Sequence, residues 1–317
     1  MAVFTHVPEA KLRNFLFGYD VGDFVSYEGI QAGVENTNYL LETTKGRFIL
    51  TLFEARIRED SLPFCFRYME HLRKNGISCP TVVPDAQGYE TQIFCSRPTS
   101  ILTFLQGASL QESAITPAHC EKIGAYLAHM HKAGEGFEAY RPNPVGQDEW
   151  NALYCKIAAA ADTVEEGLAE RVVDVLIDVR ENQPGKLPFG PVHADLFPDN
   201  VFFTGDDVSG VIDFYFSCTD TFIYDAAMTF NAWCGAPDFS LDTAKATAFW
   251  RGYQSVRPLS SLEKKYFPIL RQAAAMRILL TRLHDWLFQP DEDVLIKAKN
   301  PKEYIAKMEW KDGVDAF

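Results

Sequence analysis

Four residues between positions 193 and 213 have the types and spacing needed for phosphoryl-transfer chemistry. His193, Asp195 and Asn200 form an H-x-D-x-x-x-x-N pattern, which is the spacing of phosphotransferase catalytic loops. We predict that Asp195 orients an acceptor hydroxyl and takes its proton. Asn200 and Asp213 supply amide and carboxylate oxygens of the kind that Mg²⁺ binds, so we predict a magnesium site there. His193 is interpreted as the residue that holds this loop by hydrogen bonds.

The residues that follow Asn200 predict a hairpin. Stretches 201–203 and 208–212 are strand-like, and turn-forming residues separate them. Opposite ends of an antiparallel pair lie about 5 Å apart. We therefore expect Asn200 and Asp213 to meet beside Asp195. An Asx-rich turn before an ordinary hairpin is the alternative interpretation of the motif.

Predicted strands dominate the chain before residue 108. The loop between the first two strands contains Gly33 and Asn36, which are candidates for covering a nucleotide's phosphates with backbone N–H groups. An ordinary β-turn is the alternative for this loop. The expected elements are a helix over 5–17, strands over 24–29, 38–43 and 47–53, a helix over 61–75, and strands over 91–96 and 100–105.

Helical patterns dominate after residue 108, and residues 102–107, with Phe104 as a candidate adenine-side residue, form the predicted hinge. This order predicts an α+β fold with a β-rich nucleotide-binding lobe over 1–105 and a helical lobe over 108–317. A catalytic loop in a helical lobe that faces a β-rich lobe is the arrangement of protein-kinase-like enzymes. Helices are expected over 117–133, 147–162, 165–182, 222–234, 240–256, 260–288 and 301–309.

The composition is that of a soluble globular protein with an ample core. The 317 residues are 47% hydrophobic and 23% charged. A net charge of −13 disfavours nucleic acid and anionic membranes as partners. The seven cysteines are scattered without a C-x-x-C motif, which predicts reduced thiols and no zinc site. No signal-peptide pattern and no long apolar run is present, so we expect a cytoplasmic protein.

The motifs HADLFPDN (193–200) and GVIDF (210–214) resemble the catalytic core of the aminoglycoside phosphotransferase and choline kinase superfamily. The similarity is closer to its bacterial homoserine kinase branch, on three further stretches that with these motifs cover most of the chain. These stretches are GVENTNYLLET with RFILTLFE (33–54), DFYFSCTDTFIYDAAMTFNAW (213–233) and MRILLTRLHDW (276–286).

This resemblance implies phosphorylation of the L-homoserine hydroxyl by MgATP, which yields O-phospho-L-homoserine for threonine biosynthesis. It implies Asp195 as the catalytic base, Asn200 and Asp213 as metal ligands, and Asp225 as a structural aspartate. On the residues alone, Asp225 could equally be a carboxylate near a helix N-terminus. His129 and His131 lie two residues apart, so they share no helical face and are interpreted as packing or surface residues.

Two family residues are missing. Thr51 stands where a strand carries the phosphate-binding Lys or Arg, and Cys65 stands where a helix carries its Glu partner. Losing both together leaves no unpaired charge. Thr51 is kept as a candidate nucleotide-side residue. Arg47 and Arg56 are candidate replacements for the base, with an ordinary surface role as the alternative.

Further features favour a small acceptor over a protein. Ala194 replaces the Arg that binds an activation-loop phosphate in protein kinases, and no A-P-E motif follows Asp213. Homoserine carries a carboxylate, for which Arg277 and Arg282 are candidates, and an ammonium, for which Asp220 is the candidate. The alternative is that the two arginines extend along the surface or pair with neighbours such as Asp285.

Two rival functions stay open on the sequence. The acceptor could be another small alcohol, such as choline, a methylthio sugar or an aminoglycoside. A nucleotide-binding pseudokinase is the second rival, because the phosphate-binding base is missing. The intact set of Asp195, Asn200 and Asp213 argues against this second rival. The oligomeric state does not follow from the sequence.

Overall fold

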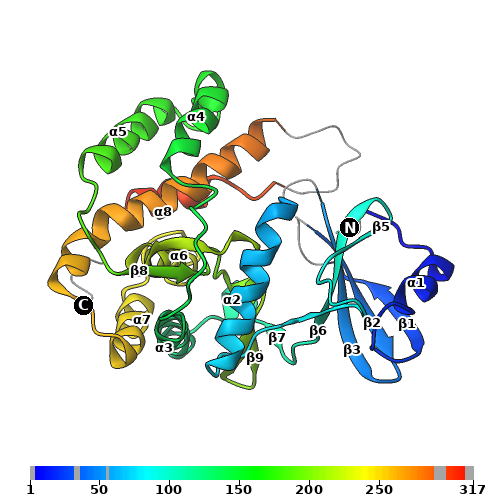
Figure 1. Ribbon diagram of the computed structural model, residues 1–317. Helices are drawn as coiled ribbons and strands as arrows, with labels where there is room; N and C mark the ends of the chain where they lie inside the picture. Colours follow the sequence, from blue (N-terminus) through cyan, green and yellow to red (C-terminus); the bar gives the residue numbers. More distant parts are fainter. Residues whose placement is uncertain (1–3, 32–35, 55–56, 289–297, 311–317) are drawn as a thin grey trace.

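A computed structural model describes residues 4–31, 36–54, 57–288 and 298–310. Figure 1 shows a β-rich group of elements beside a larger, mainly helical group. The β-rich group comes first in the chain, and the helical group follows it. The predicted α+β fold class is therefore confirmed. The division of the chain at residues 105 and 108 stays a prediction.

The β-rich group is built on a six-stranded antiparallel sheet. Side chains alternate between the two faces of a strand, so β3 directs Leu50 and Leu52 to the α1 side and Phe53 to the α2 side. In Figure 1, α2 accordingly lies between the sheet and the helical group. The elements are α1 (Glu9–Leu16), β1 (Phe24–Gly29), β2 (Asn36–Thr43), β3 (Gly46–Phe53), η1 (Glu59–Ser61), α2 (Leu62–Lys74), β4 (Val82–Val83), β5 (Gln92–Phe94) and β6 (Arg97–Thr103).

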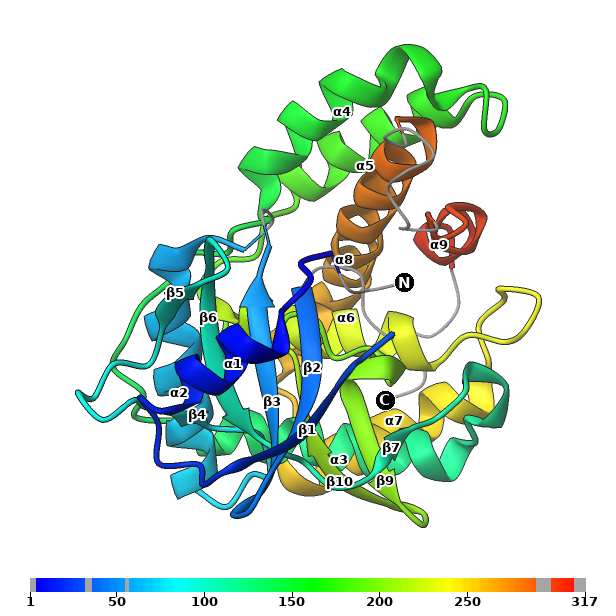
Figure 2. The ribbon, with the colours of Figure 1, turned by 90° about the vertical axis from the view of Figure 1, so that its right-hand side faces the viewer.

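The helical group is organised around α8 (Ser261–Leu287), which packs against α4, α5, α6 and α9. Figure 2 shows α4 and α5 together at the top of the molecule and α9 beside α8. The other helices are η2 (Glu112–Ala114), α3 (Pro117–Ala133), α4 (Gln147–Ala161), α5 (Leu168–Glu181), η3 (Pro198–Asn200), η4 (Phe214–Phe216), α6 (Phe222–Trp233), α7 (Thr243–Val256) and α9 (Lys302–Met308).

Helices α3 and α7 approach each other closely at two glycines. A Cβ atom at Gly124 would lie 2.2 Å from the Phe249 carbonyl oxygen, and one at Gly252 would lie 1.9 Å from the Glu121 carbonyl oxygen. Both distances are too short for any larger side chain. The two glycines are therefore required by the packing of these helices.

Two small sheets complete the helical group, and the sequence analysis missed most of their strands. One has the order β10 (Asp207–Val211), β9 (Val201–Thr204), β7 (Ala108–Ser109), and the other pairs β11 (Cys218–Thr221) with β8 (Phe189–Val192). Strands of two to four residues have no usable alternation, and β8 contains Gly190 and Pro191, which are unusual in strands.

Most helix boundaries agree with expectation to within a few residues. The largest correction concerns α1, which was expected over 5–17 and begins at Glu9 because Pro8 is its N-cap. No helix in the described ranges is both long and apolar enough to cross a bilayer.

Candidate active site

The hairpin predicted after Asn200 is present. Strands β9 and β10 pair antiparallel, with Val201 opposite Val211. The Ile212 N–H then donates to the Asn200 carbonyl oxygen at 3.0 Å. Asn200 and Asp213 are therefore brought to the same end of the hairpin, as the spacing predicted.

Asp225 on α6 holds the backbone of the loop that precedes the hairpin. Its two carboxylate oxygens accept the backbone N–H groups of His193 (3.1 Å) and Ala194 (2.8 Å). The His193 ring is buried against Phe214, and its Nε2 donates to the Ile212 carbonyl oxygen at 3.0 Å. Burial lowers the pKa of His193, so the ring stays neutral and acts as a brace between loop and hairpin.

Asp225 is oriented in turn by His131 on α3. His131 Nε2 lies 3.0 Å from Asp225 Oδ2, and its Nδ1 lies 2.7 Å from the Tyr253 hydroxyl. The ionised Asp225 carboxylate can only accept, so Nε2 of the neutral His131 ring carries the proton, and Nδ1 accepts from the Tyr253 hydroxyl, which itself accepts from Arg257. Burial opposes ionisation of Asp225, but its bond from His131 and the neighbouring donors hold its pKa below the usual range.

Asp195 combines partial burial with a nearby cation. Asn200 Nδ2 donates to the Asp195 carbonyl oxygen at 2.8 Å and to its Oδ2 at 3.2 Å. Arg277 Nη1 lies 3.7 Å from Asp195 Oδ1, and 18% of the Asp195 side chain remains exposed. Burial raises the pKa of Asp195 to about 6, although Arg277 opposes this shift. A carboxylate with this pKa is ionised at pH 7 and is well matched to accept a proton.

Asp213 occupies an unusual backbone conformation. Its φ of 67° lies in the left-handed region, and η4 starts directly after it. Five non-glycine residues in the described ranges have positive φ, and two of them, Ala194 and Asp213, belong to this site. Such conformations cost free energy and persist where the surroundings enforce them, as at catalytic and ligand-binding residues.

The donor set of Asn200 and Asp213 suits a hard cation that is shared with phosphate oxygens. Because Asn200 Nδ2 bonds to Asp195, the Asn200 Oδ1 atom is the one left to meet a metal. Mg²⁺ is usually held by one or two protein oxygens plus phosphates and waters. No group of three or more His, Cys, Asp or Glu side chains in the described ranges could hold a metal by itself. The residues thus fit a cation bound together with a nucleotide.

The candidate nucleotide-side residues are placed as follows. Thr51 is buried and donates from Oγ1 to Asn38 Oδ1 at 2.8 Å. Asn36 is buried and accepts the Glu54 N–H, so its side chain caps the end of β3. Phe104 follows β6, with Arg47 stacked 4.1 Å from its ring centre. Gly33 and Arg56 lie outside the described residues.

Arg277 and Arg282, the candidate partners of the acceptor's carboxylate, lie five residues apart on α8 and contact different segments. Arg277 is buried and donates to the Ala194 carbonyl oxygen at 2.7 Å, next to Asp195. Arg282 pairs with Glu303 of α9 and stacks on Tyr304 at 4.5 Å. Of the two, only Arg277 contacts the loop that carries Asp195. Pairing with a neighbour was the alternative considered for Arg282 from sequence, and the neighbour that it pairs with is Glu303.

Asp220, the ammonium candidate, lies on β11. Its Oδ2 accepts from Asn143 Nδ2 at 2.8 Å, and its Oδ1 accepts from the Thr221 N–H at 2.6 Å. Burial raises the pKa of Asp220, while these hydrogen bonds oppose the shift. Burial raises the pKa of Tyr224 on α6, and the charges of Arg277 and Asp220 make smaller contributions of opposite sign.

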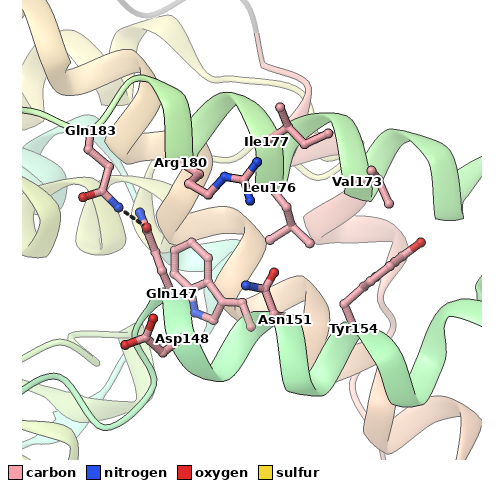
Figure 3. Close-up of a pocket in the computed structure, with 10 residues that line it drawn as sticks. Gln147, Asp148, Asn151, Tyr154, Val173, Leu176, Ile177, Arg180 and Gln183 are labelled. Carbon is pink, nitrogen blue, oxygen red and sulfur yellow. Dashed lines mark hydrogen bonds between the residues drawn. The ribbon is translucent and has the colours of Figure 1, made fainter.

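A cavity of about 320 Å³ lies between α4 and α5, away from these residues. Figure 3 shows Tyr154, Leu176 and Arg180 among the side chains around it. None of the predicted catalytic, nucleotide or acceptor residues lines it. It is therefore not the site at which phosphoryl transfer is predicted.

Comparison with known proteins identifies the family. The phosphotransferase enzyme family matches residues 26–259. A homoserine kinase of Brucella anthropi is 47% identical over 310 residues, covering 98% of this chain and 94% of that protein. A homoserine kinase of Xanthobacter autotrophicus is 45% identical over 316 residues, covering 100% and 98%.

The chain belongs to the phosphotransferase enzyme family, in its homoserine kinase branch. The resemblance predicted from the motifs is confirmed. Among solved structures, an amicoumacin kinase in complex with AMP-PNP, Ca²⁺ and Ami has a TM-score of 0.71 at 16% identity, covering 95% of this chain and 92% of that one. At this identity the likeness concerns the fold, and it confirms the kinase-like architecture.

Two residues of this family member were missed or undervalued from sequence. His131 was interpreted as a packing or surface residue; it is a buried packing residue, and its additional contact with Asp225, which holds the predicted catalytic loop, was not foreseen. Arg141 was not among the predicted site residues, yet it binds the segment that follows Asp213. Neither has a spacing signal, because each partner lies more than 70 residues away in the chain.

Proposed function

We propose that this protein transfers the γ-phosphoryl group of ATP to the side-chain hydroxyl of L-homoserine, forming O-phospho-L-homoserine and ADP for threonine biosynthesis. The observation that carries the proposal is the 45–47% identity to homoserine kinases over essentially the whole chain. The grouping of Asp195, Asn200 and Asp213 at one end of a hairpin supports the same reaction. All seven cysteines are free thiols, which supports a cytoplasmic enzyme.

Asp195 is the general base of the proposed reaction. Its carboxylate accepts a hydrogen bond from the acceptor hydroxyl and takes the proton as the oxygen attacks the γ-phosphorus. The new O–P bond forms while the bond from the γ-phosphorus to the β,γ-bridging oxygen breaks, and ADP leaves. Asn200 fixes the Asp195 carboxylate through the 3.2 Å bond to Oδ2, so the base is oriented before the substrate arrives.

Asn200 and Asp213 are the proposed ligands of Mg²⁺. When bound, the cation would neutralise charge on the transferring phosphate and the leaving ADP. The pairing of the hairpin and the bonds of Asp225 to the loop backbone fix the positions of Asn200 and Asp213 relative to Asp195. Gly33, Asn36, Thr51 and Phe104 remain the predicted nucleotide-side residues.

Homoserine is proposed to bind with its hydroxyl on Asp195 and its charged end toward α8. Arg277 is the favoured partner for the carboxylate, because its guanidinium lies beside Asp195 and can form two parallel hydrogen bonds. Asp220 is the predicted partner for the ammonium. Arg282 is retained as a second carboxylate candidate, although Glu303 already occupies its Nη1.

The deciding experiment measures magnesium-dependent ADP release from ATP with five separate acceptors. These acceptors are L-homoserine, D-homoserine, L-serine, choline and kanamycin. We expect release with L-homoserine and at most a trace with the others. The Asp195→Asn variant serves as the control for contaminating kinases.

The same panel separates the rival functions. ADP release with choline or kanamycin instead of L-homoserine would agree with the assigned base and metal ligands but would reject L-homoserine as the acceptor. Binding of ATP without ADP release for any acceptor would reject the proposed kinase activity and favour a nucleotide-binding pseudokinase.

A further inference from the structure

The ion pair that joins strand to helix in protein kinases is absent, and its two positions make other contacts. In those enzymes an ion pair between a Lys on the third strand and a Glu on the following helix must be in place together with the metal-bound Asp. Here Thr51 bonds to Asn38 on the neighbouring strand. Cys65, in the first turn of α2, lies against the segment that follows Asp213, with Sγ 3.9 Å from the Tyr215 carbonyl oxygen.

Arg141 supplies a cation at this contact. Its Nη1 donates to the carbonyl oxygens of Tyr215 at 2.9 Å and Ser217 at 2.7 Å, and lies 3.4 Å from Cys65 Sγ. Nη1 carries two hydrogens, so the two carbonyls take both, and the sulfur is a weak additional acceptor. Hydrogen bonds from a charged donor are roughly twice as strong as neutral ones.

The backbone of Arg141 is itself fixed to the protein. Its N–H donates to Thr219 Oγ1 at 3.2 Å, and its carbonyl oxygen accepts the Thr219 N–H at 2.7 Å. Through its backbone and its guanidinium, Arg141 joins the loop between α3 and α4 to the start of α2, to η4 and to β11. The bonds to Tyr215 and Ser217 clamp the backbone two and four residues after Asp213.

Aromatic packing completes the same junction. Tyr215 lies edge-on to Phe53 at 5.0 Å between ring centres, and Phe214 lies edge-on to Tyr68 of α2 at 5.9 Å. The sheet and α2 therefore both press on η4. If Arg141 were removed, these apolar contacts would remain, but the carbonyl oxygens of Tyr215 and Ser217 would lose their charged donor.

We propose that Arg141 is a positioning residue that fixes the segment after Asp213 beside Cys65, the position at which the Glu of the missing Lys–Glu pair would stand. It holds the Asp213 segment against α2 in the backbone conformation that presents the carboxylate to a metal. This inference rests on the proposed function, because it assumes that Asp213 binds the cation that accompanies ATP. It does not depend on which alcohol is the acceptor.

The test compares Arg141→Met and Arg141→Lys with wild type by calorimetric binding of ADP, with and without Mg²⁺. Mutations of residues that orient metal ligands cost about 10- to 100-fold in metal affinity. We therefore expect the Mg²⁺ concentration for half-maximal enhancement of ADP binding to rise about tenfold or more in Arg141→Met. ADP affinity without Mg²⁺ should stay within about twofold of wild type, and Arg141→Lys should recover part of the loss because it keeps a cation that can donate.

Arg251→Met is the matched control, because Arg251 is an exposed arginine on α7 that pairs with Glu121. It should leave both binding measurements unchanged. Unaltered Mg²⁺ dependence in Arg141→Met would overturn the proposal. Equal loss of ADP affinity with and without Mg²⁺ would also overturn it, because that pattern indicates direct contact with phosphate.

Should Arg141→Met fail to fold, Arg141→Lys decides alone. It must show a raised Mg²⁺ requirement with unchanged ADP affinity in the absence of Mg²⁺, and a wild-type Mg²⁺ requirement would reject the proposal. Because the assay contains no acceptor, an incorrect assignment of homoserine would leave its outcome unaffected. The two proposals can thus fail separately.

Discussion

The predicted catalytic hairpin and the predicted acceptor side of the site are constructed differently. His193, Asp195, Asn200 and Asp213 come from 21 consecutive residues, and a local hairpin brings them together. The acceptor side takes its candidates from β11 and α8, which are distant in the chain. The geometry of the first depends on backbone pairing within one segment, whereas that of the second depends on how helices pack.

Arg277 and Arg282 illustrate the consequence of this difference. Five residues of α-helix turn through about 140°, so two arginines that look equivalent in the sequence face different neighbours. Arg277 contacts the catalytic loop, and Arg282 contacts α9. Residue type and spacing predicted that Asn200 and Asp213 meet at one end of the hairpin, as they do, but on the acceptor side they gave only candidate residues.

The largest expected effect is on the hairpin side. Asp195→Asn should lower kcat by about 10³-fold, within the range for removing a general base. The amide keeps the shape of the side chain but cannot take the proton. ATP affinity should change less than about twofold, because Asp195 is not a predicted metal ligand. Steady-state kinetics and calorimetric ATP binding would measure both quantities.

Asp199→Asn is the matched control for that variant. Asp199 lies four residues from Asp195, is 66% exposed, and faces Lys299 at 3.6 Å. It should retain kcat to within about threefold, since exposed ion pairs contribute little. If Asp195→Asn and Asp199→Asn behaved alike, the hairpin would no longer be the catalytic side of the comparison.

How well the sequence predicts the structure follows the same division. The expected hairpin strands and most helices were found with small shifts, because their apolar periodicity and turn residues are local signals. Strands β8 and β11 were missed, since four-residue strands with Gly190, Pro191 and Asp220 carry no such signal. They form only because tertiary packing brings them together.

The supports of the site were equally invisible in the sequence. The contacts of His131 with Asp225 and of Arg141 with Tyr215 span 94 and 74 residues. Neither residue has a neighbour in sequence that would distinguish it from an ordinary surface histidine or arginine. The roles of the nucleotide-side and acceptor residues stay predictions for the same reason.

An intermediate effect is expected where the two sides meet. Arg277→Met should raise the KM for L-homoserine about tenfold or more, because a charged hydrogen-bonding partner of the carboxylate is lost. Arg277 also lowers the pKa of Asp195, which burial raises to about 6. Removing this cation should raise that pKa further. The acidic limb of the kcat/KM profile should therefore move to higher pH.

Arg277→Lys separates the two contributions. It retains the charge, so the acidic limb should stay near the wild-type position, but it lacks the planar fork that binds a carboxylate through two bonds. A raised KM with an unmoved limb would support Arg277 as the acceptor's partner. An unchanged KM in both variants, measured against homoserine concentration, would assign Arg277 to tuning Asp195 alone.

The smallest catalytic effect is expected for Arg282, where the packing of α9 takes precedence over substrate binding. Arg282 and Lys307 both pair with Glu303, whose pKa their charges lower although burial opposes this. Arg282→Ala should reduce the free energy of unfolding by about 1–2 kcal/mol, because Glu303 keeps Lys307 as a partner. The KM for L-homoserine should change less than about threefold.

Thermal unfolding and steady-state kinetics on the same preparation test both expectations. A tenfold rise in KM without a loss of stability would instead place Arg282 with Arg277 at the acceptor, and would show that α8 presents two arginines to one substrate.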